Sequence, residues 1–354
     1  MKLTEAPMKF GIMNLFPSTD SVDEAKEIEN TLEEAVLADE LGFDSVWLAE
    51  HHFSRYGILG SPLMFGMAIA SQTKRITIGS AVVVLPFHDP LRLAEEASLL
   101  DIISKGRVRL GVGRGYKPDE FKGFRVKPEN SVEMYNETID ILKLAWTGEQ
   151  FSYDGNQYQL NDVTVYPKPF TPGGPPILQA TVSPDSYRKR GLAGDHIITS
   201  PNFTPVRMMK ENFDVYRDAL VEGGHNVDNF GIPFMQQVWC GGEMGEGKET
   251  AAQASLNYYR SVGQIIPGAE DALEAEIEYY EKVRKNIDLL TLEKTLAHGG
   301  NFGSVDQVVD TIGRLGNDLG VTEYIGWFRI PSLERTIALD AMAKFATEVI
   351  PQFS

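Results

Sequence analysis

Short apolar segments alternate with amphipathic segments along the whole of this 354-residue chain. Each apolar segment is rich in β-branched residues and is bounded by Gly, Pro or charged residues, as buried strands are. Eight of these segments are predicted strands: 10–15, 45–49, 76–85, 108–112, 177–180, 196–199, 234–240 and 324–328. Because strands and helices alternate, the pattern predicts an α/β protein with a parallel sheet.

Between the predicted strands, apolar residues recur every three or four positions, which is the spacing of an amphipathic helix. Residues 132–146, 206–220 and 305–319 show this spacing most clearly. The third helix is expected to begin after Ser304, because Gln307 three residues later completes a capping box.

Most of the predicted strands are apolar throughout, which indicates a sheet that is covered on both faces. Eight parallel strands, each followed by a helix, predict a (β/α)8 TIM barrel, and an open doubly wound sheet is the alternative. A barrel needs about 250 residues. We therefore expect a single domain over residues 1–354 with insertions near 147–176 and 241–301. Aromatic residues on both sides of Asp154-Gly155 predict a hairpin in the first insertion, and the second is expected to be a helical excursion near the barrel mouth.

The charge balance narrows the range of partners. Lys and Arg number 33 and Asp and Glu number 50, so the net charge of -17 opposes binding to nucleic acid or to an anionic membrane. The charged residues Lys2, Glu5 and Lys9 interrupt the stretch where a signal peptide would be apolar, which predicts a cytoplasmic protein. Cys240 is the one cysteine, so an intrachain disulfide and a cysteine-based metal cage are excluded. A small-molecule partner is expected.

One predicted strand ends in three ionisable residues, Glu50, His51 and His52. The carboxyl ends of barrel strands form the rim where catalytic groups lie. For an isolated pair, it is equally plausible that one histidine caps a carbonyl while the other is solvated. Zinc is disfavoured, because adjacent histidines of an extended chain point in opposite directions, and no metal is predicted.

At two further strand ends, the sequence has groups that are suited to binding an anion. Gly113, Arg114 and Gly115 follow the strand at 108–112, where glycines permit close backbone approach and a guanidinium can grip a phosphate. An ordinary turn is the more frequent role of such glycines. Ser183 and Pro184 begin a predicted helix, whose free amides favour an anion, although a plain N-cap explains them equally well.

Several long segments resemble the bacterial-luciferase-like flavin-dependent monooxygenases. They are Val-Trp-Leu-Ala-Glu-His-His-Phe at 46–53 and the segments at 56–62, 78–86 and 99–107. The resemblance is strongest over residues 8–130 and continues at 171–175, at 181–186 and in the final strand and helix. It covers nearly the whole chain apart from the second insertion.

The resemblance implies a luciferase-like TIM barrel that binds reduced FMN supplied by a separate flavin reductase. Reaction with O2 would form a C4a-peroxyflavin, which oxygenates a small organic substrate such as an aldehyde, a ketone or an aromatic polyketide-like ring. Members of the family are often homodimers through the helices next to strands two and three, so a homodimer is expected.

The resemblance also implies roles for individual residues. His51 matches the catalytic histidine of the family, and Glu95 matches a carboxylate near the flavin. The bond between Ala81 and Val82 matches a non-proline cis peptide against the flavin ring. The implied cofactor-binding residues are Ala81, Val82, Gly113, Arg114, Thr181, Val182, Ser183 and Ser186.

Two departures from the luciferase pattern are present, of which the first indicates a different substrate and the second argues against light emission. Gly113 stands where luciferase has a cysteine, and Pro201 stands where it has an aromatic residue. Two alternatives stay open: hydride transfer with a reduced deazaflavin on the same fold, and a non-catalytic flavin-binding subunit. The intact pair His51 and His52 argues against the second alternative. The sequence does not choose between Baeyer-Villiger chemistry and hydroxylation.

Overall fold

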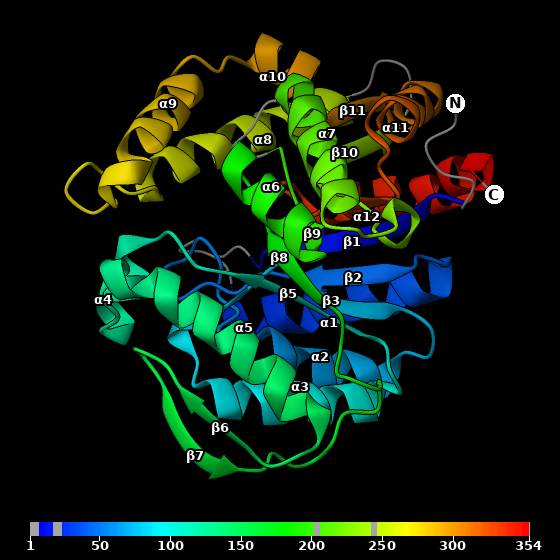
Figure 1. Ribbon diagram of the computed structural model, residues 1–354. Coiled ribbons are helices and arrows are strands. Elements are labelled where there is room, and N and C mark those ends of the chain that lie inside the picture. Colours follow the sequence, from blue (N-terminus) through cyan, green and yellow to red (C-terminus); the bar gives the residue numbers. More distant parts are fainter. Residues whose placement is uncertain (1–6, 17–22, 202–205, 242–245, 354) are drawn as a thin grey trace.

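The computed structural model describes residues 7–16, 23–201, 206–241 and 246–353. Parallel strands lie at the centre of the molecule with helices around them (Figure 1). The strands of the ring are β1 (Lys9–Asn14), β2 (Ser45–Leu48), β3 (Thr77–Ser80), β5 (Val108–Gly113), β8 (Ile177–Ala180), β9 (His196–Ile198), β10 (Pro233–Gly241) and β12 (Glu323–Trp327). All eight strands expected from the sequence are present.

The sheet closes on itself. Its strands run in the order β10-β12-β1-β2-β3-β5-β8-β9, and every pairing along this path is parallel. Thr199, directly after β9, forms a parallel bridge with Phe234 of β10 and accepts a hydrogen bond of 3.1 Å from the Met235 amide. This bridge joins the two ends of the path, so the architecture is a barrel of eight strands and the alternative of an open sheet is wrong.

One predicted strand is divided in two. The segment expected at 76–85 forms β3 and the short strand β4 (Val83–Val84), which pairs with β5. Between them, the peptide bond from Ala81 to Val82 is cis, as the resemblance implied.

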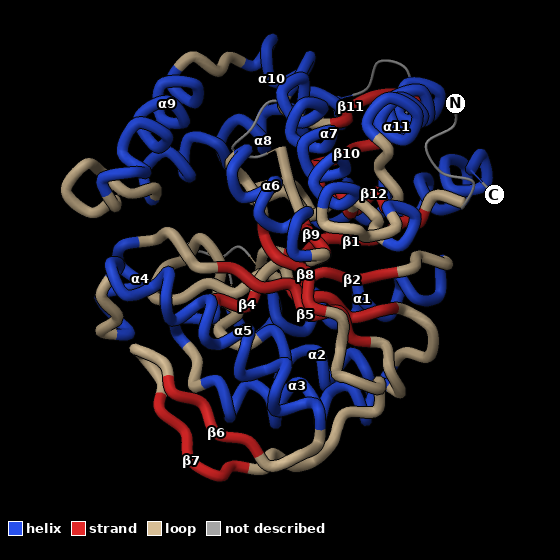
Figure 2. The backbone as a smooth tube through the Cα atoms, in the orientation of Figure 1, coloured by secondary structure: helices blue, strands red, loops and turns tan. Residues whose placement is uncertain are grey.

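Helices cover the outside of the barrel, and Figure 2 shows them on both sides of the central strands. The predicted amphipathic helices are confirmed as α5 (Ser131–Thr147), α7 (Val206–Glu222) and α11 (Val305–Leu319), and the capping box of Ser304 and Gln307 is formed. The other helices of this layer are α1 (Glu24–Leu41), α2 (Pro62–Gln72), α3 (Pro90–Ser104), α6 (Pro184–Ala193) and α12 (Arg335–Lys344).

The two long connecting segments have the secondary structure that the sequence predicts. In the first, β6 (Phe151–Asp154) and β7 (Gln159–Val163) form an antiparallel hairpin. The second contains the 3-10 turn η4 (Glu274–Glu276) and the helices α8 (Glu246–Ile265), α9 (Ile277–Asp288) and α10 (Leu292–His298), while residues 242–245 lie outside the described residues.

One strand was not expected. β11 (Asn301–Ser304) pairs with the last residues of β10, from Val238 to Gly241. Its sequence, Asn-Phe-Gly-Ser, is short and mostly polar, so it lacks the β-branched run by which strands are recognised.

Apolar side chains form two clusters. The larger one includes Phe10, Val46 and Phe213, which lie between the barrel and its helices. The second lies at the carboxyl ends of the strands, beneath α8 and α9, and we call it the mouth cluster. Its buried members are Met13, Leu15, Trp47, Ala49, Leu178, Ile198, Met235, Tyr258, Tyr259, Val262, Ile266, Tyr280, Val283, Ile287, Ile325 and Trp327. Helices α8 and α9 therefore cover the barrel mouth. Among the described residues, no helix combines the length and hydrophobicity needed to cross a bilayer.

Candidate active site at the barrel mouth

A carboxylate holds His51, which lies three residues beyond the end of β2. The Nδ1 atom of His51 is 3.1 Å from Oε1 of Glu120, on helix α4 (Pro118–Phe124). The same oxygen accepts hydrogen bonds from the backbone amide of His52, at 2.9 Å, and from Nζ of Lys117, at 3.0 Å. A carboxylate can only accept here, so Nδ1 of His51 carries the proton and Nε2 is left as the acceptor.

The environment keeps the His51 imidazole neutral. Burial lowers the pKa of His51, and the opposing effect of Glu120 is the smaller one. Burial would raise the pKa of Glu120, but its hydrogen bond to His51 and the amide of His52 outweigh this effect and hold that pKa below its usual value. A neutral imidazole beside an ionised carboxylate is the arrangement of a general base whose orientation is fixed.

A second buried carboxylate lies directly before His51. Glu50 accepts hydrogen bonds from His52 Nε2, at 2.8 Å, and from His88 Nε2, at 3.0 Å. It also accepts the backbone amide of Val84, at 3.0 Å. Burial would raise the pKa of Glu50, yet these donors lower it below the usual value. The side chains of the two adjacent histidines thus contact different carboxylates.

Aromatic side chains connect His51 to the helices above the mouth. The ring of Tyr56 lies edge-on to the imidazole, with centroids 4.7 Å apart. The Tyr56 hydroxyl is 2.7 Å from that of Tyr258 on α8, whose ring is 4.7 Å from the Trp327 ring. Burial raises the pKa of Tyr56 well above its ordinary value, so these phenols stay neutral and can donate hydrogen bonds.

Next to this aromatic group, the ends of β3 and β5 form a narrow surface. Ala81 and Val82 pack against the mouth cluster. A Cβ atom at Gly113 would lie 2.5 Å from Cγ2 of Val82, so only glycine permits this close approach. A flat ligand could therefore lie against these strand ends without displacing a side chain at position 113.

Arg114, which is predicted to bind a phosphate, is paired with a carboxylate in this structure. Arg114 donates to Oγ of Ser131 at 3.1 Å, and it forms an ion pair with Glu276 of η4. Glu276 belongs to the long segment that covers the mouth, so this carboxylate shows that the Arg114 guanidinium faces a place where an anion can sit.

The start of α6 lies beside Arg114. Because Val112 is in register with Gln179, the neighbouring strand ends bring Arg114 level with Thr181. Oγ of Ser183 accepts the amide of Ser186, at 3.3 Å, which makes Ser183 the N-cap of α6. Ser183 is exposed and Ser186 is half-buried, whereas the buried Thr181 hydroxyl donates to the Gln179 carbonyl. The N-cap of α6 therefore follows the strand next to the one that leads to Arg114, and the exposed Val182 directly precedes this N-cap.

Glu95 lies apart from these contacts. It is half-buried in the second turn of α3. Among the described residues, the carboxylates that bond to the histidines of the mouth are Glu50 and Glu120.

Sequence reasoning missed Glu120 and His88. No local signal marks them, because each reaches the site by tertiary contact. Glu120, for example, is separated from His51 by 69 residues.

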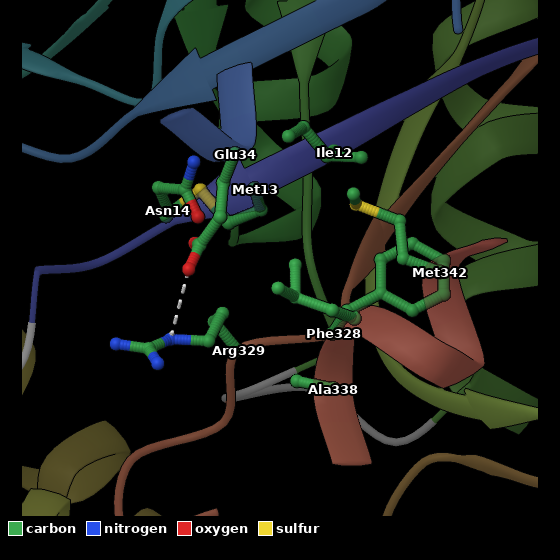
Figure 3. A pocket seen from close by; sticks show the side chains of 9 residues that line it. Ile12, Met13, Asn14, Glu34, Phe328, Arg329, Ala338 and Met342 are labelled. Atoms are coloured by element: carbon green, nitrogen blue, oxygen red, sulfur yellow. Dashed lines mark ion pairs between the residues drawn. The ribbon is translucent and has the colours of Figure 1, made fainter. Parts of the chain in front are cut away.

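A separate cavity of about 10 Å³ lies outside the barrel wall, between β1, α1 and α12. Figure 3 shows Asn14 and the ion pair of Glu34 with Arg329 beside it. Its volume is about that of one water, so it is too small for an organic ligand.

Comparison with known proteins gives matches along most of the chain. The family model described as "Luciferase-like monooxygenase" matches residues 8–323. The alkanal monooxygenase alpha chain of the Kryptophanaron alfredi symbiont is 32% identical over 222 residues, which are 63% of this chain and 62% of that protein. The match therefore spans less than two thirds of the relative's length.

Solved structures match over the full length. Monooxygenase RslO1 from Streptomyces bottropensis superposes with a TM-score of 0.84 at 26% identity, covering 98% of this chain and 100% of that one. The oxygenating constituent of 3,6-diketocamphane monooxygenase from Pseudomonas putida, in complex with FMN, has a TM-score of 0.80 at 20% identity and covers 99% of both chains. An F420-dependent secondary alcohol dehydrogenase has a TM-score of 0.76 at 16% identity, covering 97% of this chain and 99% of that one. The last two likenesses concern the fold alone.

Proposed function

Since this chain belongs to the luciferase-like monooxygenase family, we propose that it is a flavin-dependent monooxygenase that oxygenates a small organic substrate with O2. Its flavin would be reduced FMN supplied by a separate flavin reductase. The observation that carries the proposal is the neutral, carboxylate-anchored imidazole of His51 at the barrel mouth, on the same rim as Arg114 and the start of α6.

Arg114 and the first turn of α6 would hold the phosphate of FMN. A guanidinium matches phosphate geometry, and the hydroxyls of Ser183 and Ser186, which bond within the first turn of α6, would turn toward the phosphate at this helix N-terminus. The flavin ring would lie against Ala81 and Val82, where Gly113 leaves room for a close approach. When bound, the reduced flavin supplies the electrons that activate O2.

His51 would then accept or position a proton at the reacting centre. Glu120 fixes the Nδ1 proton, so the Nε2 atom can accept a proton from the substrate or share one with the activated oxygen. Helices α8 and α9, with Tyr258 and Tyr259, cover the mouth and would keep water away from that oxygen.

The alternative cofactor is a deazaflavin of the F420 type. The barrel of the F420-dependent alcohol dehydrogenase is similar, and the phosphate-binding groups would serve either cofactor. The absorbance and mass of the chromophore that copurifies with the protein distinguish the two.

We also propose a homodimer formed through α2 and α3. These neighbouring helices expose large apolar side chains: Met64, Leu99, Ile102 and Ile103. On a chain with a net charge of -17, such a patch is most readily covered by a second copy of itself. Light scattering tests this, and a monomer mass at micromolar concentration would contradict it.

The proposal is tested with the purified chain, photoreduced FMN, O2 and a set of aldehydes and ketones. His51→Ala should leave FMN affinity nearly unchanged and should lower the ratio of oxygenated product to hydrogen peroxide. An unchanged ratio would remove His51 from the mechanism. If the unmodified chain yields no product from any substrate while it binds FMN tightly, the non-catalytic subunit is the better interpretation.

A further inference from the structure

The side-chain amide of Gln237, on β10, is buried and lacks partners. The residue is 1% exposed, and neither Oε1 nor Nε2 has a hydrogen-bond partner among the described residues. Burying an amide without hydrogen bonds costs free energy, so such groups are rare and each one needs a cause. A ligand that bonds to the amide would be such a cause.

The register of the strands shows where this amide lies. Gln237 is in register with Trp327, and Met235 is in register with Ile325. Residues in register on neighbouring strands point to the same face of a sheet, and Met235, Ile325 and Trp327 all belong to the mouth cluster. Gln236 faces the opposite way, where its Oε1 accepts a hydrogen bond from the Tyr324 hydroxyl at 3.3 Å. The Gln237 amide therefore points into the barrel mouth.

The position of β10 places Gln237 across the mouth from the predicted flavin surface. In the closed ring, β12, β1 and β2 separate β10 from β3 on one side, and β9, β8 and β5 separate them on the other. The strands are thus diametrically opposite. A flavin ring against Ala81 and Val82, which follow β3, would leave the space toward Gln237 for the substrate.

A second unpartnered polar atom lies on the helix above. Ser255 of α8 is fully buried, and its Oγ has no partner among the described residues. It lies three and four residues before Tyr258 and Tyr259, so it shares their face of the helix, which packs on the mouth cluster. Helix α8 also contacts β10.

The charges near the mouth indicate a neutral ligand. Within the described part of the chain, Arg109 inside the barrel is paired with Glu323, and Lys117 at the rim is paired with Glu120. A carboxylate buried beside Gln237 would have to compete with Glu323 and Glu120 for these two cations, so its desolvation would be poorly offset. Met13, Trp327 and Tyr258 suit a hydrophobic body.

From these observations, we infer that Gln237 is a substrate-binding residue whose amide hydrogen-bonds the carbonyl or hydroxyl oxygen of a neutral, hydrophobic substrate. The location of the flavin in this inference rests on the proposed function, whereas the orientation of the Gln237 amide comes from the strand register.

The experiment measures the binding of three compounds with one ring system: α-tetralone, the hydrocarbon tetralin and a tetralin carboxylate. Calorimetric titrations use the full chain, both loaded with oxidised FMN and free of flavin. Gln237→Met removes the amide while keeping the length of the side chain. Gln236→Met is the matched control, since its amide faces away from the mouth. Gln237→Leu serves as a second variant if the first does not fold.

Gln237→Met should weaken α-tetralone binding about three- to tenfold, the effect of one lost hydrogen bond. It should leave tetralin and FMN affinities unchanged, and the carbonyl stretching band of bound α-tetralone should move to higher wavenumber. Gln236→Met should leave α-tetralone affinity unchanged. The unmodified chain should bind the carboxylate more weakly than α-tetralone.

Three results would overturn the inference: equal α-tetralone affinity in the chain and in Gln237→Met, no α-tetralone binding by the unmodified chain, or a loss of FMN affinity in Gln237→Met, which would assign the amide to the cofactor. Failure of the proposed function looks different. In that case FMN and riboflavin would bind equally or not at all, while the difference between α-tetralone and tetralin would persist in the flavin-free chain.

Discussion

The ion pair of Arg114 and Glu276 makes a quantitative prediction about FMN affinity. If the phosphate of FMN binds Arg114, it must first displace the Glu276 carboxylate from the guanidinium. Glu276→Gln removes this competing charge and keeps the shape of the side chain. FMN should therefore bind the variant more tightly than the unmodified chain.

The exposure of the pair sets the magnitude. The side chains of Arg114 and Glu276 are 22% and 30% exposed, so solvent screens their attraction. Pairs of this kind contribute about 0.2–1 kcal/mol, which corresponds to about a 1.4- to fivefold gain in FMN affinity. Arg114→Met should have the opposite and larger effect, a loss of about 1.5–3 kcal/mol for the charged hydrogen bonds to phosphate. In the Arg114→Met background, Glu276→Gln should then change FMN affinity very little.

Quenching of FMN fluorescence on titration with protein measures these affinities. Riboflavin, which lacks the phosphate, should bind the chain and Glu276→Gln equally. The matched control is Glu278→Gln, an exposed residue of α9 whose replacement changes the net charge by the same amount. Unchanged or weaker FMN binding in Glu276→Gln would refute the idea that the phosphate displaces Glu276 from Arg114. If Glu276→Gln and Glu278→Gln increased FMN affinity equally, the increase would be an effect of net charge alone.

Three further predictions follow from the charged groups of the barrel. Glu120→Gln should lower the pKa of His51 further, because the hydrogen bond and charge that oppose burial are lost; a rise in the NMR titration would contradict the assignment. Burial would lower the pKa of His88, but Glu50 raises it above 6.5. The stability lost in His88→Gln should therefore be largest below pH 6.5 and should shrink as the pH rises through the folded-state pKa; a pH-independent difference in denaturant titrations would exclude this linkage. Glu323→Gln should reduce the free energy of unfolding by about 3 kcal/mol, because it leaves Arg109 without its partner in the barrel; urea unfolding that shows no loss would mean that solvent reaches Arg109.

The rim groups could be predicted because a barrel gathers the carboxyl ends of all its strands at one end. His51, Arg114 and Ser183 lie far apart in the sequence, yet each follows a predicted strand, and the structure places each of them at the mouth. The place of the cis bond between Ala81 and Val82 was also predicted, from the resemblance. The carboxylate beside His51 could not be predicted in this way, because Glu120 lies within helix α4 and does not directly follow a strand.

The amino-acid sequence alone determined the strands, the amphipathic helices and the rim on which chemistry could take place, because apolar runs, helical periodicity and caps such as Ser304 are local properties. Only the tertiary structure decided which groups face one another across that rim. Glu276 reaches Arg114 across 162 residues. The Gln237 amide is unpaired because no described residue around it in the closed ring forms a hydrogen bond with it. Such contacts depend on the relative placement of whole elements, which no short stretch of sequence encodes.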